Sequence, residues 1–329
     1  MRVTGLNISG IFILPALLLL IACERNDYEL LDPESAGKWT LYTTADGLPS
    51  NQVSSIRLDS NGNLWVSFPG FGVARYDNNS WNYFRAATSQ LINDGVNYIA
   101  GATDGTVLIG TVSGISVLAE NNSWSSYVDP ADGMDITSIK VASNGWIWLG
   151  TRTQGFYLNS DSGYVKTLLT GFENVRSIEE GLQGAIYIGT DKGILRYLNG
   201  NYSFIRKTDG LPDENVKALR YDSKERLWIG PEGGTNVAWI DRKGIHQVNL
   251  MTGTDSLKIR DIFEDRRGNI WFATHNNGLI RYDGVVSRSF KEFNGLPENS
   301  INCIGEDKYG NLWFGLYSKG LLKYTLPID

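Results

Sequence analysis

Short segments in which apolar and polar residues alternate recur along the chain from residue 38 to its end. One of them, residues 53–58, is followed by the turn at residues 59–63 and then by a nearly apolar segment that begins at Leu64. β-Branched and aromatic residues dominate such segments, and turns that contain Gly, Asn or Asp separate them. The pattern predicts many short β-strands joined by tight hairpins.

A motif of the form Gly-x-[Leu/Ile]-Trp sets the period of these segments. Its central residue recurs seven times at intervals of 39 to 43 residues, at Trp65, Leu108, Trp148, Tyr187, Trp228, Trp271 and Trp313. An Ile or Leu stands nine residues before each of these anchors and marks a preceding strand. A period of about 40 residues with four short strands per unit is typical of propeller blades. The sequence therefore predicts an all-β fold, a seven-bladed β-propeller of four-stranded antiparallel blades over residues 38–329.

The two ends of the repeat region indicate how the ring closes. The seventh unit reaches Tyr324 with only five residues after it, which is too few for a fourth strand. Trp39 and Tyr42 have the Trp-x-x-Tyr spacing of a fourth strand but precede the first complete unit. We therefore expect the strand at residues 38–42 to complete the seventh blade.

The first residues have a different character from the repeats. Arg2 precedes an apolar run at residues 11–21, which is short for a bilayer span, and the run ends in Leu20-Ile21-Ala22-Cys23. This tetrapeptide resembles the lipobox of bacterial lipoproteins, which implies a signal peptide at residues 1–22 and lipidation of Cys23. The alternative is an uncleaved helix. The acid-rich residues 23–37 would form a tether, and Glu24 favours an outer-membrane location. The lipid anchor would be the only contact with the membrane.

Charge and composition exclude several classes of function. The 329 residues carry a formal net charge of -6 with acidic and basic residues interspersed, so nucleic acid is not an expected partner. No phosphate-binding Gly loop or zinc motif occurs, and we expect neither cofactor nor metal. Asp59-x-Asn61-x-Asn63 resembles a calcium loop only superficially and is better explained as a hairpin turn. Cys303 would have no partner once Cys23 is acylated, and we expect a buried structural thiol.

The blocks Asp46-Gly47-Leu48-Pro49 and Gly62-Asn63-Leu64-Trp65 resemble the two-component regulator propeller repeat, as do later Gly-Leu-Pro turns at residues 210–212 and 295–297. The resemblance covers residues 38–329. It implies an extracytoplasmic sensor propeller of the kind found in hybrid histidine kinases, which often respond to oligosaccharides. No kinase or spanning helix follows the repeats in this sequence, so we expect the fold and a recognition role to carry over, without phosphotransfer.

Loops that follow the anchor strands should meet loops that precede the first strands on one face, around the channel mouth, where propellers usually bind ligands. These loops differ in chemistry from repeat to repeat and offer aromatic rings, amides and charges that could bind a sugar or another polar ligand. The candidate ligand-binding residues are Phe68, Phe71, Arg152, Gln154, Asp191, Lys192, Glu232, His275, Asn276, Asn277, Tyr317 and Lys319.

Three functions remain open from the sequence. The leading one is a monomeric, non-catalytic, sensor-like binding module for a carbohydrate or another polar small molecule. The second is a platform that docks an envelope protein. The third resembles the streptogramin lyases, with His275 as a general base and Glu232 as the carboxylate beside it, although a base needs a second group to orient it.

Overall fold

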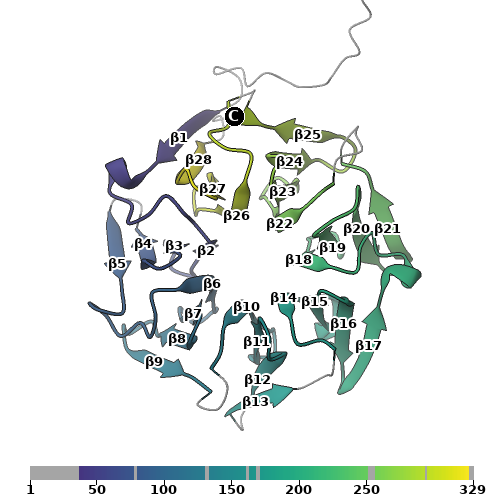
Figure 1. The fold of residues 1–329 in the computed structure, drawn as a ribbon, viewed down its shortest axis with the longest axis horizontal. Coiled ribbons are helices and arrows are strands. Elements are labelled where there is room, and N and C mark those ends of the chain that lie inside the picture. The colour runs from purple at the N-terminus through teal and green to yellow at the C-terminus, as the bar shows by residue number, and fades with distance from the viewer. Residues whose placement is uncertain are drawn as a thin grey trace, which may run out of the picture.

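Seven four-stranded antiparallel sheets surround a central channel in the computed structural model, which describes residues 37–77, 80–129, 133–160, 163–167, 171–250, 256–292 and 295–325 (Figure 1). The predicted all-β, seven-bladed propeller is confirmed. The predicted signal peptide at residues 1–22 and nearly all of the predicted tether at residues 23–37 lie outside the described residues. Within the part that is described, no helix is long and apolar enough to cross a bilayer.

Each blade runs from the channel outward in chain order. The first four blades are β2 (Ser55–Leu58), β3 (Leu64–Phe68), β4 (Gly72–Tyr76) and β5 (Trp81–Phe84); β6 (Val96–Gly101), β7 (Val107–Thr111), β8 (Gly114–Leu118) and β9 (Trp124–Tyr127); β10 (Ile136–Val141), β11 (Ile147–Thr151), β12 (Phe156–Ser160) and β13 (Gly163–Thr167); β14 (Val175–Glu180), β15 (Ile186–Thr190), β16 (Gly193–Leu198) and β17 (Asn201–Ile205).

The remaining blades follow the same scheme, and three short 3-10 helices that the structure describes in full lie in loops. Blades five to seven are β18 (Val216–Tyr221), β19 (Leu227–Pro231), β20 (Val237–Asp241) and β21 (Gly244–Val248); β22 (Ile259–Glu264), β23 (Ile270–Thr274), β24 (Leu279–Tyr282) and β25 (Ser287–Phe290); β26 (Ile301–Glu306), β27 (Leu312–Leu316), β28 (Leu321–Thr325) and β1 (Lys38–Tyr42). The helices are η1 (Thr44–Asp46), η2 (Leu182–Gly184) and η3 (Lys207–Asp209).

The N-terminal strand β1 completes the seventh blade, as predicted. It pairs antiparallel with β28, and Trp39 lies opposite Tyr324 with ring centroids 4.4 Å apart. The Trp39 ring also lies 5.8 Å from that of Phe314 and 6.3 Å from that of Phe290 in blade six. The first strand therefore joins the last blade to its neighbour as well as pairing with it.

The anchor residues lie at the interfaces between blades. The side chains of Trp65, Trp148, Trp228, Trp271 and Trp313 are almost fully buried. Trp271, for example, packs on Phe314 of the next blade with centroids 5.6 Å apart. Apolar aromatic area removed from water in this way is a large stabilising contribution. The prediction that the tryptophans mainly hold blades together is confirmed.

Most of the innermost strands contain a β-bulge close to their first residue. In six blades the pairing register shifts between the first and third residues of the inner strand, so that the second residue has no partner opposite it. Such a β-bulge re-aims the side chain of the extra residue. Six blades thus turn one side chain each out of the regular pairing at the same height in the channel.

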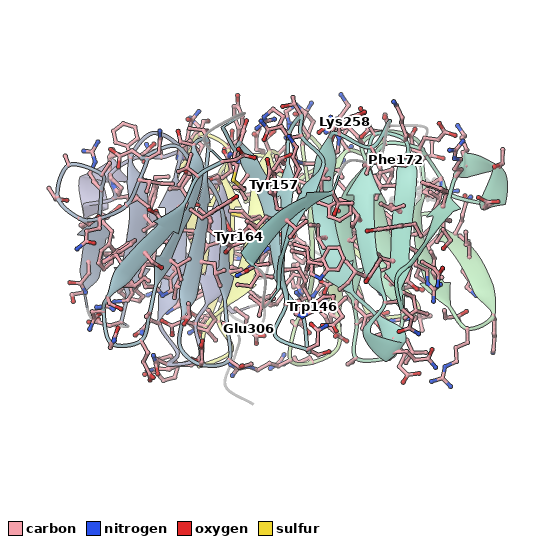
Figure 2. The ribbon with its side chains drawn as sticks, turned by 90° about the horizontal axis from the view of Figure 1, so that it is seen from below. Trp146, Tyr157, Tyr164, Phe172, Lys258 and Glu306 are labelled. Carbon is pink, nitrogen blue, oxygen red and sulfur yellow. The ribbon has the colours of Figure 1, made fainter. Side chains whose placement is uncertain are left out.

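The bulges lie near the face that the sequence predicted to be the functional one. In five blades the loop after the second strand bonds there to the loop before the first strand of the same blade, as in His275 N to Lys258 O at 2.9 Å and Tyr317 N to Ser300 O at 3.0 Å. Figure 2 shows Lys258 near this face and Glu306, at the end of β26, toward the opposite one. We call the first of these the mouth face.

Candidate ligand-binding site

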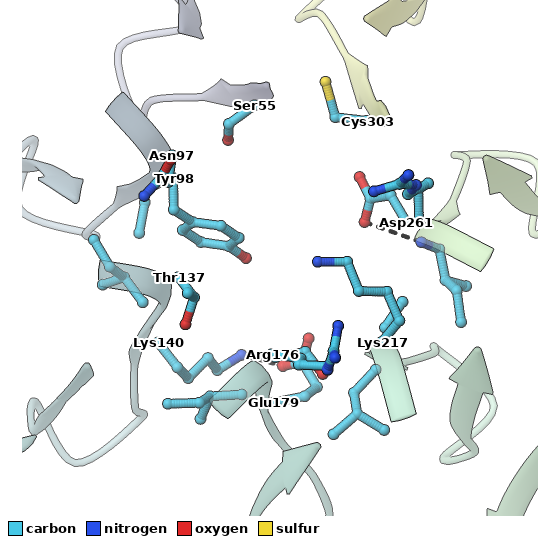
Figure 3. Close-up of a pocket in the computed structure, with 18 of the residues that line it drawn as sticks. Ser55, Asn97, Tyr98, Thr137, Lys140, Arg176, Glu179, Lys217, Asp261 and Cys303 are labelled. Atoms are coloured by element: carbon cyan, nitrogen blue, oxygen red, sulfur yellow. Dashed lines mark hydrogen bonds and ion pairs between the residues drawn. The ribbon is translucent and has the colours of Figure 1, made fainter. Parts of the chain in front are cut away.

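A cavity of about 600 Å³ occupies the channel and is lined mainly by the seven innermost strands (Figure 3). Its size lies in the range of small-molecule sites. Most of the charged side chains that line it are positive. The lining contains two carboxylates, Glu179 and Asp261, and seven cationic side chains, Arg57, Lys140, Arg152, Arg176, Lys217, Arg220 and Arg260. A chain of formal net charge -6 therefore encloses a cationic channel.

Residues at equivalent positions of the seven inner strands form a ring just inside the mouth, which we call the rim ring. It consists of the six bulge residues and the corresponding serine of blade one, namely Ser54, Asn97, Thr137, Arg176, Lys217, Arg260 and Asn302. Every member lines the cavity. Their chemistry divides the ring into a neutral and a cationic part.

The neutral members bind the next blade. Ser54 Oγ donates to Val96 O at 2.9 Å, and Thr137 Oγ1 donates to Val175 O at 2.6 Å. The amide groups of Asn97 and Asn302 donate to the corresponding carbonyls of the following blades at 3.0 and 2.9 Å. Each of these side chains satisfies a main-chain acceptor across a blade boundary, so its role is structural.

The cationic members, Arg176, Lys217 and Arg260, occupy three consecutive blades, and we call them the cationic arc. Arg176 lies 4.0 Å from Glu232 Oε2, and Arg260 Nη2 donates to His275 Nδ1 at 3.2 Å. The Nε atoms of both arginines are buried and have no hydrogen-bond partner among the residues that the structure describes. Figure 3 shows the Lys217 side chain extending into the open centre of the channel.

The positive charges of the cationic arc influence the pKa of Lys217. Its pKa is lowered to about 8, first because burial disfavours the charged ammonium and second because Arg176 lies nearby. Arg260 and Arg152 act in the same direction, whereas Glu232 opposes them. Close positive charges in a partly desolvated site are therefore the dominant feature of the mouth.

Deeper in the channel the cations have partners. Lys140 forms an ion pair with Glu179, and Arg57 donates to Tyr98 Oη at 2.8 Å and lies 3.9 Å from Asp261 Oδ2. Asp261 Oδ2 also accepts from Ile304 N of the next blade at 3.0 Å. These ion pairs crosslink the blades, in contrast to the cationic arc above them, whereas Arg220 lies 5.2 Å from the centroid of the Phe263 ring and forms no ion pair with a described residue.

Four of the twelve candidate residues from the sequence gather at this site. Arg152 and Tyr317 line the cavity, Glu232 faces Arg176, and His275 accepts from Arg260. The rings of His275 and Tyr317 lie 6.4 Å apart in an edge arrangement. The loops after the anchor strands thus lie around the channel mouth as expected, and the ligand-binding role of their residues stays a prediction.

The other candidates lie outside the cavity lining. Phe68 is fully buried in the core of blade one, so it is corrected from a face residue to a core residue. Asn277 is only 8% exposed, and its backbone is held by Thr274 Oγ1, so the turn uses it structurally. The partly or fully exposed candidates that do not line the cavity are Phe71, Gln154, Asp191, Lys192, Asn276 and Lys319.

His275 lacks the surroundings that a general base needs. Its Nδ1 faces the Arg260 guanidinium and lies 3.4 Å from Ser300 Oγ. Burial and the nearby Arg260 and Lys258 lower its pKa, and Glu232 acts only through space. A cation beside the imidazole holds it neutral, but no carboxylate among the described residues hydrogen-bonds to orient it.

Two further sequence interpretations concern chemistry elsewhere. Asp59 Oδ1 accepts from the backbone of Asn61 and Asn63 at 3.0 and 2.8 Å, which confirms the hairpin explanation of this segment. Cys303 lies on β26 with its side chain buried, as expected of a structural thiol. Burial raises the pKa of the Cys303 thiol strongly, and the charge of Asp261 acts in the same direction. Its reactive thiolate is therefore disfavoured.

The cationic arc was missed from the sequence. Aligning the repeats on the Ile or Leu nine residues before each anchor, and reading two residues further back, gives Ser, Asn, Thr, Arg, Lys, Arg and Asn in order. This column contains the signal. It was overlooked because a regular strand would not predict that the bulge turns this position into the channel.

Comparison with known proteins finds a repeat model that matches three segments of this fold. The model described as "Two component regulator propeller" matches residues 47–70, 253–276 and 295–318, which include the anchors of blades one, six and seven. Histidine kinase P4 of Formosa agariphila is 27% identical over 241 residues, covering 64% of this chain and 17% of that protein. The chain thus spans a small part of this curated relative.

Solved structures share the architecture. The extracellular domain of the two component system BT3049 from B. thetaiotaomicron superposes with a TM-score of 0.73 at 20% identity, over 88% of this chain and 42% of that one. A streptogramin B lyase superposes with a TM-score of 0.74 at 16% identity, over 89% and 98% of the two chains. At these identities the likeness shows the fold alone, which enzymes and sensors share. The resemblance seen in the sequence is confirmed: three segments of this seven-bladed propeller match the model of the two-component regulator propeller repeat.

Proposed function

We propose that this chain is a non-catalytic, sensor-like recognition propeller that binds a polar ligand, such as an oligosaccharide, at the mouth of its channel. The observation that carries the proposal is the polar cavity of about 600 Å³ enclosed by seven rigid inner strands. Its rim ring presents different side chains in different blades, as an asymmetric ligand requires. The family match and the extracellular domain of BT3049 support a sensor-like role outside the cytoplasm.

A lyase function has less support. The streptogramin B lyase shares the fold, but the only histidine at the mouth of this channel that the structure describes is bonded to an arginine. Binding without chemistry needs only preorganised polar groups, which the inner strands supply. We therefore propose recognition alone.

A thermal-shift screen of neutral and acidic oligosaccharides, followed by calorimetry on the hits, tests the proposal. Replacing Arg152 and Tyr317 together by Ala should weaken binding because both line the cavity, while the fold stays intact because both are exposed. Phe71→Ala is the matched control, since Phe71 is exposed but lies outside the lining. Binding that survives the double change but is lost on altering the opposite face would refute the placement.

We further propose that Cys23 carries a lipid that holds the propeller at the cell envelope, with the outer membrane favoured. The support is the Leu20-Ile21-Ala22-Cys23 segment. Cys23→Ser should shift the protein from the membrane fraction to the soluble fraction or leave the precursor unprocessed. Mass spectrometry of the wild-type protein that finds residues 1–22 intact and Cys23 unmodified would exclude this anchor.

A further inference from the structure

The cationic arc does not have the structural role of the other residues in the rim ring. The four neutral members each donate to the main chain of the next blade. The three cations make no such bond to a described residue, and within the described part of the chain the Nε atoms of Arg176 and Arg260 remain buried without an acceptor. Buried donors without partners cost free energy, and three adjacent positive charges add repulsion. A feature that destabilises the free protein needs another explanation.

An anionic ligand supplies the missing partners. Carboxylate and sulfate groups accept charge-assisted hydrogen bonds, and guanidinium groups bind them in a bidentate manner. Glu232, at 4.0 Å from Arg176, is the one carboxylate that forms an ion pair with the arc among the described residues. Its single charge leaves the arc positive. The tyrosines Tyr98 and Tyr317, which also line the cavity, offer rings on which a sugar can stack.

We infer that the ligand of this propeller is an acidic oligosaccharide, whose carboxylate or sulfate groups lie between Arg176, Lys217 and Arg260. This inference rests on the proposed function and specifies its substrate class. The ligand enters from the mouth face, where the arc lies, and its negative groups replace the missing acceptors. The neutral side of the rim ring faces its uncharged part.

Lys217 gives the complex a pH dependence. In the free protein its pKa is about 8, because of burial and of Arg176, Arg260 and Arg152, with Glu232 opposing. A bound anion favours the ammonium form, so binding takes up a proton when Lys217 is neutral beforehand. Affinity should therefore fall as the pH rises above about 8. Removing the side chain's charge should abolish this part of the pH dependence.

Calorimetry with matched disaccharides tests the inference on the whole exported protein. The probes are a uronate-containing disaccharide, a sulfated disaccharide and their neutral counterparts, so that the two sources of charge are separated. Lys217→Gln and Arg176→Gln should each weaken binding of the acidic probe by about tenfold or more, and tenfold equals about 1.4 kcal/mol. Lys217→Arg should retain binding. Lys319→Gln is the matched control, because it removes one positive charge from an exposed residue outside the cavity lining.

The outcomes separate the inference from the proposed function. Preference for either acidic probe, lost in Lys217→Gln and kept in Lys319→Gln, supports both. Equal or tighter binding of a neutral counterpart at the mouth overturns the acidic ligand but leaves the recognition function in place. An equal loss in Lys319→Gln reduces the effect to net charge and overturns the arc. If neither these probes nor the screened oligosaccharides bind, both the acidic ligand and the recognition function are overturned.

Discussion

The indole Nε1 of Trp65 donates a hydrogen bond of 2.8 Å to the carboxylate of Asp59, six residues earlier in the same hairpin. The same pair recurs in blades five, six and seven, with Trp228, Trp271 and Trp313 at 2.7, 2.8 and 3.0 Å from their aspartates. Each aspartate also accepts backbone amides of the turn, so one buried carboxylate holds both the hairpin and the anchor. Among the five tryptophan anchors, that of blade three is the exception, since Ala142 stands at the aspartate position and Trp148 Nε1 has no partner among the described residues.

Ala142→Asp should therefore stabilise the protein by about 1 kcal/mol, because it gives the buried Trp148 Nε1 an acceptor. The turn already has the required backbone, with Ala142 N donating to Trp146 O at 2.8 Å as Asp59 N donates to Asn63 O at 3.0 Å. Urea unfolding measures the change. Ala142→Leu, of similar shape but without an acceptor, is the control. An aspartate variant that is no more stable than the leucine variant would contradict this explanation.

Trp39→Ala should cost about 2 kcal/mol or more, because the ring packs on Tyr324, Phe314 and Phe290 at the closure of the propeller. Trp81→Ala is the matched control, since Trp81 packs on Tyr76 at 4.7 Å in a blade whose four strands are continuous in the chain. Hydrogen exchange should show faster exchange of β28 amides only in the Trp39 variant. Equal protection of β28 in both variants would mean that β1 does not secure the ring.

Lys217 should make the free protein more stable as the pH rises from about 8 to about 10.5. Its folded pKa of about 8 lies below the ordinary value of 10.5, so in this interval the unfolded chain binds the proton more tightly. The gain is at most about 3 kcal/mol. Urea unfolding of wild type and Lys217→Gln at both ends of the interval isolates it, because tyrosines with raised pKa values such as Tyr76 act oppositely in both proteins. Parallel pH profiles would show that Lys217 is not desolvated.

Cys303 should not react with thiol reagents in the folded protein and should react fully in urea. The side chain is 3% exposed, and burial raises the pKa of its thiol, so little thiolate is available. The rate of labelling below the unfolding midpoint measures the accessibility. Rapid labelling of the native protein would show that the thiol opens to the channel.

The sequence was sufficient for the architecture and insufficient for the site. The period of the anchors and the unpaired Trp39 strand predict seven blades and their closure, because both depend on local apolar patterns. The mouth loops were placed on the correct face for the same reason. Lys217 was not found, since its direction depends on a bulge that shifts the pairing by one residue, and its pKa depends on Arg176 and Arg260 from neighbouring blades. Such proximity arises only when neighbouring blades stack against one another.

The bulges also bear on how such a protein can change during evolution. A residue at the bulge has no paired residue on the neighbouring strand, so its identity is not constrained by strand pairing. The same position holds an amide in Asn97, a hydroxyl in Thr137 and an ammonium in Lys217, on one unchanged backbone plan. Where the residue makes no bond to the next blade, as at Lys217, duplicated copies of this gene could thus acquire new ligands by single substitutions that leave the fold intact. The fold and the ligand specificity of such a propeller can therefore evolve separately.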